Sequence, residues 1–251
     1  MTGPAVTILI ERSLAAFSSL WTDAGGIAVL THCLYPGGDG VAVRVDVESA
    51  GYRVSDDGGG WTALLQAGID PSPSQVRRAH AVAEDGGMAF HQGSFLADEV
   101  GESQLGAAIV MVANASQRWV RDVLDEQERR VERDLKRRVL EQLKRLFPAH
   151  AIEQDHSIVG DSTKAYHVAQ TIKLDGRLLL IEPVANQANA LAATFLKFSD
   201  IGKAHGDWPR ETVIQGKSSW KAEDINLLAE VSTGISDIDT GLEPIRAKYA
   251  A

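Results

Sequence analysis

The feature that most constrains this chain is a helical pattern of apolar residues that runs from Glu102 to Phe147. Leucine, isoleucine, valine and tryptophan recur there at intervals of mostly three, four or seven residues, the spacing of one helix face. Pro148 closes the pattern, because proline cannot continue a helix interior. One or two helices are therefore expected in the middle of the chain. Their exposed apolar stripe could pair with another copy, so a homodimer is also expected.

The segment ahead of these helices has the pattern of an α+β module. Helical apolar spacing over residues 8–21 is followed by a strand from Ile27 and a turn rich in proline and glycine. Residues 41–47 place valine at every second position, which predicts a half-buried strand. The remaining predicted elements are short, and they are a hairpin return at 48–55, a helix at 61–69, a helix after the loop at 71–74 with Ser74 as a possible cap, and a small hairpin at 88–100.

A different order of elements follows Pro148. The patterns predict a strand at 156–162, a hairpin of strands at 165–174 and 177–184 joined by the turn Asp175–Gly176, a helix at 186–201, a strand at 211–216, and a helix within 218–232 capped by Ser218 or Ser219. The predicted fold class is α+β, with an α+β module at 1–116, a helical connector at 117–147 and an α/β module at 148–251.

The net charge of −9 lies unevenly along the chain. Residues 1–116 hold 5 basic and 13 acidic side chains, whereas residues 117–147 hold 10 basic and 7 acidic ones. An acidic body repels nucleic acid over much of its surface, so contact with DNA or RNA would have to be local. Cys33 is the single cysteine, which excludes an intrachain disulfide and suits a reducing cytoplasm. The N-terminal apolar run is too short for a membrane span and lacks a basic region ahead of it, so a cytoplasmic protein without membrane contact is expected.

The stretch "GYRVSDDGGGW" (51–61) places two carboxylates, Asp56 and Asp57, before three glycines. A calcium loop needs ligands at alternate positions and a terminal glutamate, and a phosphate loop needs a lysine after the glycines; neither is present. An aspartate between a strand and a helix can accept backbone N–H bonds from the first helical turn. These two residues are therefore interpreted as a turn and cap, with Gly58 and its neighbours allowing a tight reversal.

The same region resembles a prophage-associated bacterial family known only as domain of unknown function 1828. The resemblance covers about residues 28–112 and rests on a Tyr-Pro-x-Gly-Asp-Gly turn, a strand pair and a Tyr-x-(Val/Leu)-(Ser/Thr)-Asp-Asp-Gly turn. The matching positions are Tyr35, Pro36, Asp39, Gly40, Tyr52, Asp56, Asp57 and Gly58. The resemblance implies a mobile-element or phage-conflict setting and no particular activity.

The predicted order of elements from about residue 125 to 232 is similar to the core of restriction-endonuclease-like nucleases. Those enzymes hold Mg²⁺ with an acidic residue on the second strand and the acid of a Glu-x-Lys or Asp-x-Lys motif on the third. Glu182 stands at the acidic position of the third strand, but Val184 replaces the lysine, and the second strand carries no acid.

Two residues could complete a rearranged nuclease site. Asp161 could approach from the first strand, and Lys197 from the following helix could replace the missing lysine. With two of the three expected groups absent, the pattern favours a nuclease-like scaffold without activity. Glu182 and His167 are then structural side chains.

The most basic helical segment offers a second candidate surface. Arg129, Arg133, Lys136 and Arg137 share one helix face, from which they could contact phosphates or an acidic protein surface. Acidic residues precede basic ones by four positions in Glu126–Arg130, Glu132–Lys136, Asp134–Arg138 and Glu141–Arg145, as in a solvated, self-neutralising helix. A solvated or dimerising helix is favoured over a nucleic-acid contact.

Three hypotheses follow. The first is a non-enzymatic binding protein of phage or mobile-element origin that acts on a host defence or nucleic-acid-handling protein, because the acidic first half suits a basic partner. The second is a Mg²⁺-dependent nuclease built from Asp161, Glu182 and Lys197. The third is a DNA-binding regulator that uses the basic helix. No cofactor is expected, apart from Mg²⁺ under the second hypothesis.

Overall fold

The computed structural model describes residues 19–23, 26–174 and 176–249. The chain divides into two compact units, Met1–Gln127 and Glu128–Ala251, and the boundary falls within helix α4 (Leu105–Leu146). Each unit combines a sheet with helices, which confirms the α+β class. Residues 8–18 of the helix predicted at 8–21 lie outside the described residues. The prediction is wrong for residues 19–21, because Ser19–Asp23 forms strand β1, which pairs antiparallel with the next strand.

The first unit is built on a six-stranded antiparallel sheet with the order β1-β2-β3-β4-β6-β5. Its further strands are β2 (Gly26–Leu34), β3 (Gly40–Glu48), β4 (Gly51–Ser55), β5 (Ala89–His91) and β6 (Ser94–Val100). The alternation predicted at 41–47 is confirmed as far as Val45: Val41, Val43 and Val45 are buried, whereas Arg44 and Asp46 are half-buried. It is wrong at Val47, which is 78% exposed. Both predicted hairpins, β3–β4 and β5–β6, are present.

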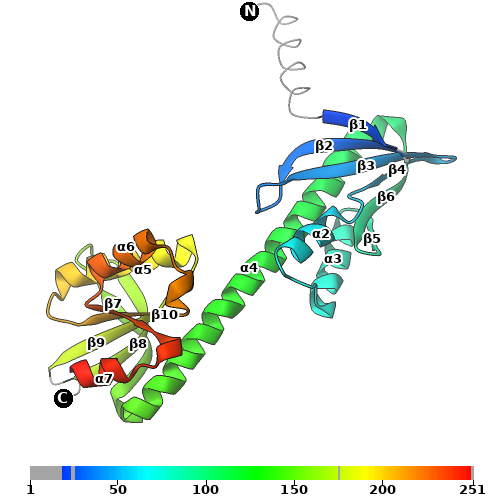
Figure 1. Ribbon diagram of the computed structural model, residues 1–251. Helices are drawn as coiled ribbons and strands as arrows, with labels where there is room; N and C mark the ends of the chain where they lie inside the picture. The colour runs from blue at the N-terminus through cyan, green and yellow to red at the C-terminus, as the bar shows by residue number, and fades with distance from the viewer. Residues whose placement is uncertain (1–18, 24–25, 175, 250–251) are drawn as a thin grey trace, which may run out of the picture. The chain divides into compact units, whose positions relative to one another are not determined.

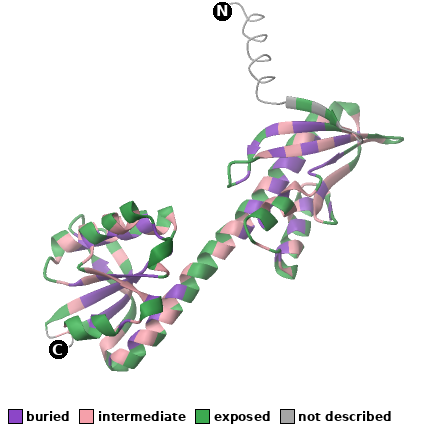
Figure 2. Ribbon diagram, in the orientation of Figure 1, coloured by how far each residue is buried: buried purple, intermediate pink, exposed green. Residues whose placement is uncertain are grey.

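Three helices supply the other half of the first core. Helices α2 (Gly59–Gln66) and α3 (Pro73–Asp85) lie on the same side of the sheet as the first part of α4 (Figure 1). Trp119 of α4 is 1% exposed and packs in one apolar cluster with the sheet valines. The buried positions therefore gather between the sheet and these helices (Figure 2).

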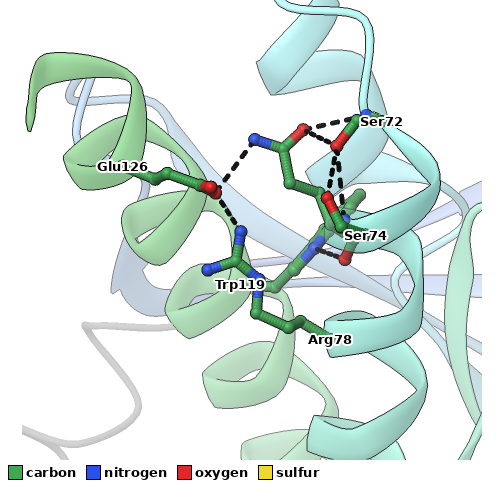
Figure 3. A network of polar contacts seen from close by, with 6 residues as sticks. Ser72, Ser74, Arg78, Trp119 and Glu126 are labelled. Atoms are coloured by element: carbon green, nitrogen blue, oxygen red, sulfur yellow. Dashed lines mark hydrogen bonds and ion pairs between the residues drawn. The ribbon is translucent and has the colours of Figure 1, made fainter. Parts of the chain in front are cut away.

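A polar network fixes α3 against α4 (Figure 3). Ser72 caps α3 through a reciprocal capping box with Gln75, so the predicted cap Ser74 is wrong by two residues. Pro73 explains the shift, because proline suits the first helical position. The side-chain amide of Gln75 donates to a Glu126 carboxylate oxygen at 3.2 Å, and the backbone carbonyl of Gln75 accepts from the Trp119 indole at 3.0 Å. Arg78 also contacts Glu126.

The second unit contains a mixed five-stranded sheet with the order β11-β10-β9-β8-β7. Strands β7 (Ile152–Val159), β8 (Ala165–Leu174) and β9 (Arg177–Pro183) form an antiparallel meander. Strands β10 (Arg210–Ile214) and β11 (Gly234–Asp237) continue the sheet parallel to β9. Gly176 has a φ of +79° at the predicted β8–β9 turn, while Asp175 lies outside the described residues.

Helices cover both faces of this sheet (Figure 1). The second part of α4 and helix α7 (Glu243–Tyr249) pack on one face, and α5 (Ala188–Ala204) and α6 (Ala222–Val231) pack on the other. Helix α6 begins after Lys221 without a side-chain cap, so Ser218 and Ser219 are not its cap; they lie in a preceding 3-10 turn.

The segment predicted as a connector contributes to both cores. Trp119, Val120 and Val123 pack in the first unit, whereas Leu135 and Val139 pack in the second. None of the helices in the described ranges combines the length and apolar character needed to cross a membrane.

Candidate functional site

The most distinctive side-chain pair of the second unit is Glu182 with Lys197. Glu182 lies near the end of β9, and its side chain is 7% exposed; that of Lys197 on α5 is 15% exposed. The Lys197 ammonium lies 3.0 Å from Glu182 Oε1, and it also donates to the carbonyl of His167 at 2.6 Å. The other carboxylate oxygen, Oε2, accepts the backbone N–H of Ala169 at 3.0 Å. Both oxygens of this buried carboxylate are therefore engaged, as a buried charge requires.

The local sequence explains why this pair forms. Leu179, Leu180 and Ile181 are fully buried, so β9 is covered on both faces, as strands in parallel pairs are. Glu182 continues this buried run and needs a charged partner. Lys197 supplies the partner from the α5 face that packs on the sheet beside the fully buried Phe198.

A cleft of about 300 Å³ opens beside this pair. Arg129, Glu132 and Lys136 of α4 line it, together with Glu182 and Lys197. Lys136 donates to Glu132 Oε1 at 2.6 Å, and these two side chains are 38% and 41% exposed. Glu128 adds a third carboxylate to the lining, so acidic and basic side chains balance in this cleft.

The N-terminus of α5 contributes to the same cleft. Gln187 and Asn189 line it, and Gln187 precedes the helix without providing a side-chain cap. The first N–H groups of a helix have no partner within the helix, and they carry the positive end of its dipole. The N-terminus of α5 and two amide side chains therefore lie beside the ion pairs.

Asp161 does not join Glu182 and Lys197. It lies in the β7–β8 turn, beyond the point where Val159 pairs with Ala165. Glu182 instead reaches the N–H of Ala169, which is four residues further along β8, or about 13 Å at the rise of an extended strand. The structure thus brings together two of the three candidate catalytic residues.

The donor set does not fit a nuclease-type Mg²⁺ site. In the described part of the chain, no group of three or more His, Cys, Asp or Glu side chains is placed to hold a metal ion. Both oxygens of Glu182 already have partners, and Glu132 is paired with Lys136. His167 contacts the carboxylate of Asp155, with Nδ1 and Oδ1 3.1 Å apart, outside this cleft.

The four residues of the predicted basic face have different surroundings. Arg129 and Lys136 line the cleft. Arg137 lies 3.1 Å from Glu141 and 3.5 Å from Asp134. Arg133 is exposed on the same helix and is not part of the cleft lining.

The acidic and basic side chains of this helix also find partners on other elements. Glu132 pairs with Lys136 as predicted. Arg138 instead pairs with Asp239 at 2.9 Å, and Glu126 contacts Arg78. Four-residue spacing brings side chains near one another, but partners from other elements compete for them.

Asp56 of the segment 51–61 is a buried hub that joins several elements of the first unit. It is 2% exposed and accepts the N–H groups of Gly60 at 3.2 Å and Phe95 at 2.8 Å. Ser116 of α4 donates to it at 2.6 Å. The predicted contact with the first helical turn is thus present, and the carboxylate also joins α2, β6 and α4. Burial raises the pKa of this carboxyl above its ordinary value, although these hydrogen bonds oppose the shift.

Tyr35 extends this network. Its hydroxyl lies 2.8 Å from that of Ser116, and burial raises the pKa of Tyr35 to about 12. Sequence reasoning missed Ser116, although a serine on the apolar stripe that contains Val112 and Trp119 signals a buried hydroxyl with a partner.

The glycines after Asp56 have separate roles. Gly58 has a φ of +72°, a left-handed conformation that suits glycine. A Cβ added at Gly60 would lie 2.6 Å from the Ser116 hydroxyl, so the Ser116 side chain fits only when position 60 is glycine. Asp57 and Asp39 are exposed turn residues, and Asp57 has a φ of +49°.

Comparison with known proteins gives no match. No family model matches the chain, and neither a curated protein nor a solved structure is similar to it.

Proposed function

We propose that this chain is a non-enzymatic binding protein whose second unit holds a phosphodiester of a nucleic acid in the cleft beside Glu182 and Lys197. The observation that carries the proposal is the convergence of Arg129 and Lys136 with the uncapped N-terminus of α5. Arginine, lysine and helix N-terminal amides are the groups that bind phosphate oxygens.

The charge balance of the cleft selects the kind of phosphate. Three carboxylates balance three basic side chains, so the lining has no net positive charge to offset the second charge of a terminal phosphate. A phosphodiester carries a single negative charge and suits the helix dipole with Arg129. The second unit has 18 basic and 18 acidic side chains, so it repels a polynucleotide less than the first unit, with 7 basic and 16 acidic ones.

Binding of labelled DNA at several salt concentrations tests the proposal. Arg129→Gln should weaken binding about fivefold and reduce the slope of log K against log salt by about 1, the value for one lost phosphate contact. Arg130→Gln is the matched control, because Arg130 is an exposed neighbour on α4 outside the cleft lining. Equal losses in both variants would show general charge attraction and would overturn the proposal.

A Mg²⁺-dependent nuclease is a second candidate function. It requires Asp161, Glu182 and Lys197 to converge, and of these Glu182 and Lys197 meet at 3.0 Å. The order α4, β7, β8, β9, α5, β10 also supports the likeness to restriction-endonuclease-like cores. Plasmid and single-stranded DNA incubated with Mg²⁺ or Mn²⁺ separate the two proposals. Cleavage by the wild type that is lost in Glu182→Gln would replace the binding proposal, and we expect no cleavage by either.

We further propose that the protein acts in a phage or mobile-element setting. The family resemblance at residues 28–112 supports a prophage or mobile-element origin and action on a host protein in the cytoplasm. The exposed apolar side chain of Val131 on α4, which is 44% exposed, supports pairing with a second copy.

A further inference from the structure

The helix-covered face of the first sheet continues into apolar side chains that the described helices leave exposed. Val41, Val43 and Val45 of β3 are at most 7% exposed, but Val47, the next residue on the same face, is 78% exposed. Ile27 of β2 pairs with Val45 and is 45% exposed. Paired residues of antiparallel strands lie on the same face, so Ile27 and Val47 both continue the face that buries the core.

Strand β1 extends this exposed surface to the edge of the sheet. Leu20 pairs with the buried Val29 and is 69% exposed. The apolar strip formed by Leu20, Ile27 and Val47 therefore runs across three neighbouring strands, and each residue is the diagonal neighbour of the next. Diagonal neighbours in a sheet are about 7–8 Å apart, so the strip is about 15 Å long.

One flank of α4 adds another exposed apolar side chain beside β2. Asn114 accepts from the Cys33 thiol at 3.3 Å, and Gln117 donates to the carbonyl of Leu34 at 2.6 Å, so this flank lies along β2. Val110 stands one helical turn before Asn114 on the same flank and is 43% exposed. An occupant of the apolar strip could therefore contact α4 as well as the sheet.

The first 18 residues of the chain lead directly into this surface, because they precede β1 and Leu20 is its second residue. Their sequence contains apolar residues spaced by four, four and three positions, the spacing of one helix face: Val6, Ile10, Leu14 and Phe17. Glu11 and Arg12 fall on the opposite side of that helical pattern. At the helical rise of 1.5 Å per residue the run would span about 16 Å, close to the length of the strip.

We infer that residues 1–18 dock on the apolar strip through Val6, Ile10, Leu14 and Phe17. Phe17 stands three residues before Leu20, so the segment is tethered at one end of the strip. A tethered segment is present at high effective concentration, whereas a second copy or another protein would lose translational freedom on binding. In this arrangement Phe17 lies nearest Leu20, Ile10 lies near Ile27, and Val6 lies near Val47.

Photo-crosslinking in the full-length protein tests this docking. The photoreactive residue p-benzoylphenylalanine replaces Ile10 in one variant. In the matched control it replaces Ile8, which falls on the opposite side of the helical pattern. Mass spectrometry of the digested monomer locates the crosslinks. We expect position 10 to crosslink to peptides of its own chain that contain Ile27 or Val47, about fivefold more than position 8 does.

A second pair of variants changes the sheet instead of the segment. Val47→Asp places a carboxylate in the strip, where docking would remove its water, so the crosslink from position 10 should fall about fivefold or more. Leu34→Asp is the matched control. Leu34 is 53% exposed and pairs with Gly40, so it lies on the other face of the same sheet, and its replacement should change the crosslink less than about twofold. Hydrogen exchange of β3 and β4 verifies that both variants stay folded, and the comparison of positions 10 and 8 stands without them.

Three outcomes would overturn the inference. The first is crosslinking from position 10 that joins two chains, at twice the mass of 27.0 kDa, which would assign the strip to a second copy. The second is equal crosslinking from positions 8 and 10, or crosslinks only to peptides outside the strip, which would leave the strip to a separate partner. The third is equal loss in the two aspartate variants. The inference goes beyond the proposed function and concerns the first unit, whereas DNA binding is measured through Arg129→Gln in the second, so the two can fail independently.

Discussion

At the scale of single residues, Asp56 shows how much one buried carboxylate can hold in place. It accepts from Gly60, Phe95 and Ser116, and an asparagine there would turn one acceptor atom into a donor. We expect Asp56→Asn to lower the free energy of unfolding by about 1–3 kcal/mol, measured by urea denaturation. The control is Asp57→Asn, whose side chain is 72% exposed, and it should change stability by less than about 0.5 kcal/mol. Equal effects would contradict the role of Asp56 as a hub.

The raised pKa of Asp56 has a definite sign in its effect on stability. The folded pKa lies above the ordinary value of 3.8, so the native state binds more protons than the unfolded state between these two values. The contribution of Asp56 to stability is therefore fully present below about pH 3.8 and is lost as the pH rises through the folded pKa. We expect the stability advantage of wild type over Asp56→Asn to shrink with rising pH, in urea titrations from about pH 3 to about pH 7. An advantage that grows with pH would show that the structure favours the ionised form.

The pair of Glu182 and Lys197 should behave as a buried ion pair. Removing one partner leaves the other charge in a nearly dry site, so Lys197→Met alone should cost about 3–5 kcal/mol of unfolding free energy. The double variant Glu182→Gln with Lys197→Met should recover part of that loss. A double-mutant cycle by urea denaturation measures the coupling, and additive losses would mean that the two side chains act separately.

At the scale of elements, the start of α3 distinguishes two serines that stand on either side of Pro73. Ser72→Ala removes the capping box and should lower stability by about 1 kcal/mol. Ser74→Ala should have a smaller effect, because Ser74 lies inside the helix and only contacts the Ser72 hydroxyl at 3.0 Å. Hydrogen exchange of the first α3 amides, together with urea denaturation, checks both. A larger effect at Ser74 would restore the cap that the sequence pattern predicted.

Local patterns predicted most elements, because their causes are local. The valine alternation placed β3, and the apolar spacing placed α4 within three residues of its start. Strand β11 and helix α7 were missed. Strand β11 has four residues without alternation, and α7 is held by long-range bonds, in which Lys248 and Tyr249 donate to the buried Glu211 at 2.9 and 2.7 Å.

The candidate site was predictable in part for the same reason. Glu182 is recognisable as a charged residue in an apolar strand, and Lys197 as a helix lysine that could reach it. The position of Asp161 depends on strand register, which residue types alone do not specify. A pocket elsewhere in the first unit, lined by Trp61, His80 and Phe90, combines residues of α2, α3 and β5, and no sequence spacing connects these elements.

At the scale of the whole molecule, the two units differ in net charge. The first unit carries the net charge of −9, and the second unit is balanced. Self-repulsion destabilises a compact acidic unit, and salt screens it. We expect hydrogen exchange of the slowest amides in β2–β4 to slow between about 0.02 and about 0.3 M NaCl, with little change in β8–β10. Equal slowing in both sheets would show a general salt effect.

The close approach between Gly60 and the Ser116 side chain also limits which substitutions this sequence can accept. Any side chain at position 60 would meet the hydroxyl of Ser116, a residue 56 positions away on another helix. Replacement of Ser116 by glycine or alanine would leave space for a side chain at position 60, and it would remove the hydrogen bond that Ser116 donates to Asp56. Related chains should therefore change positions 60 and 116 together, with a small residue at 116 wherever 60 is not glycine, and a collection of such chains would carry this contact as a covarying pair.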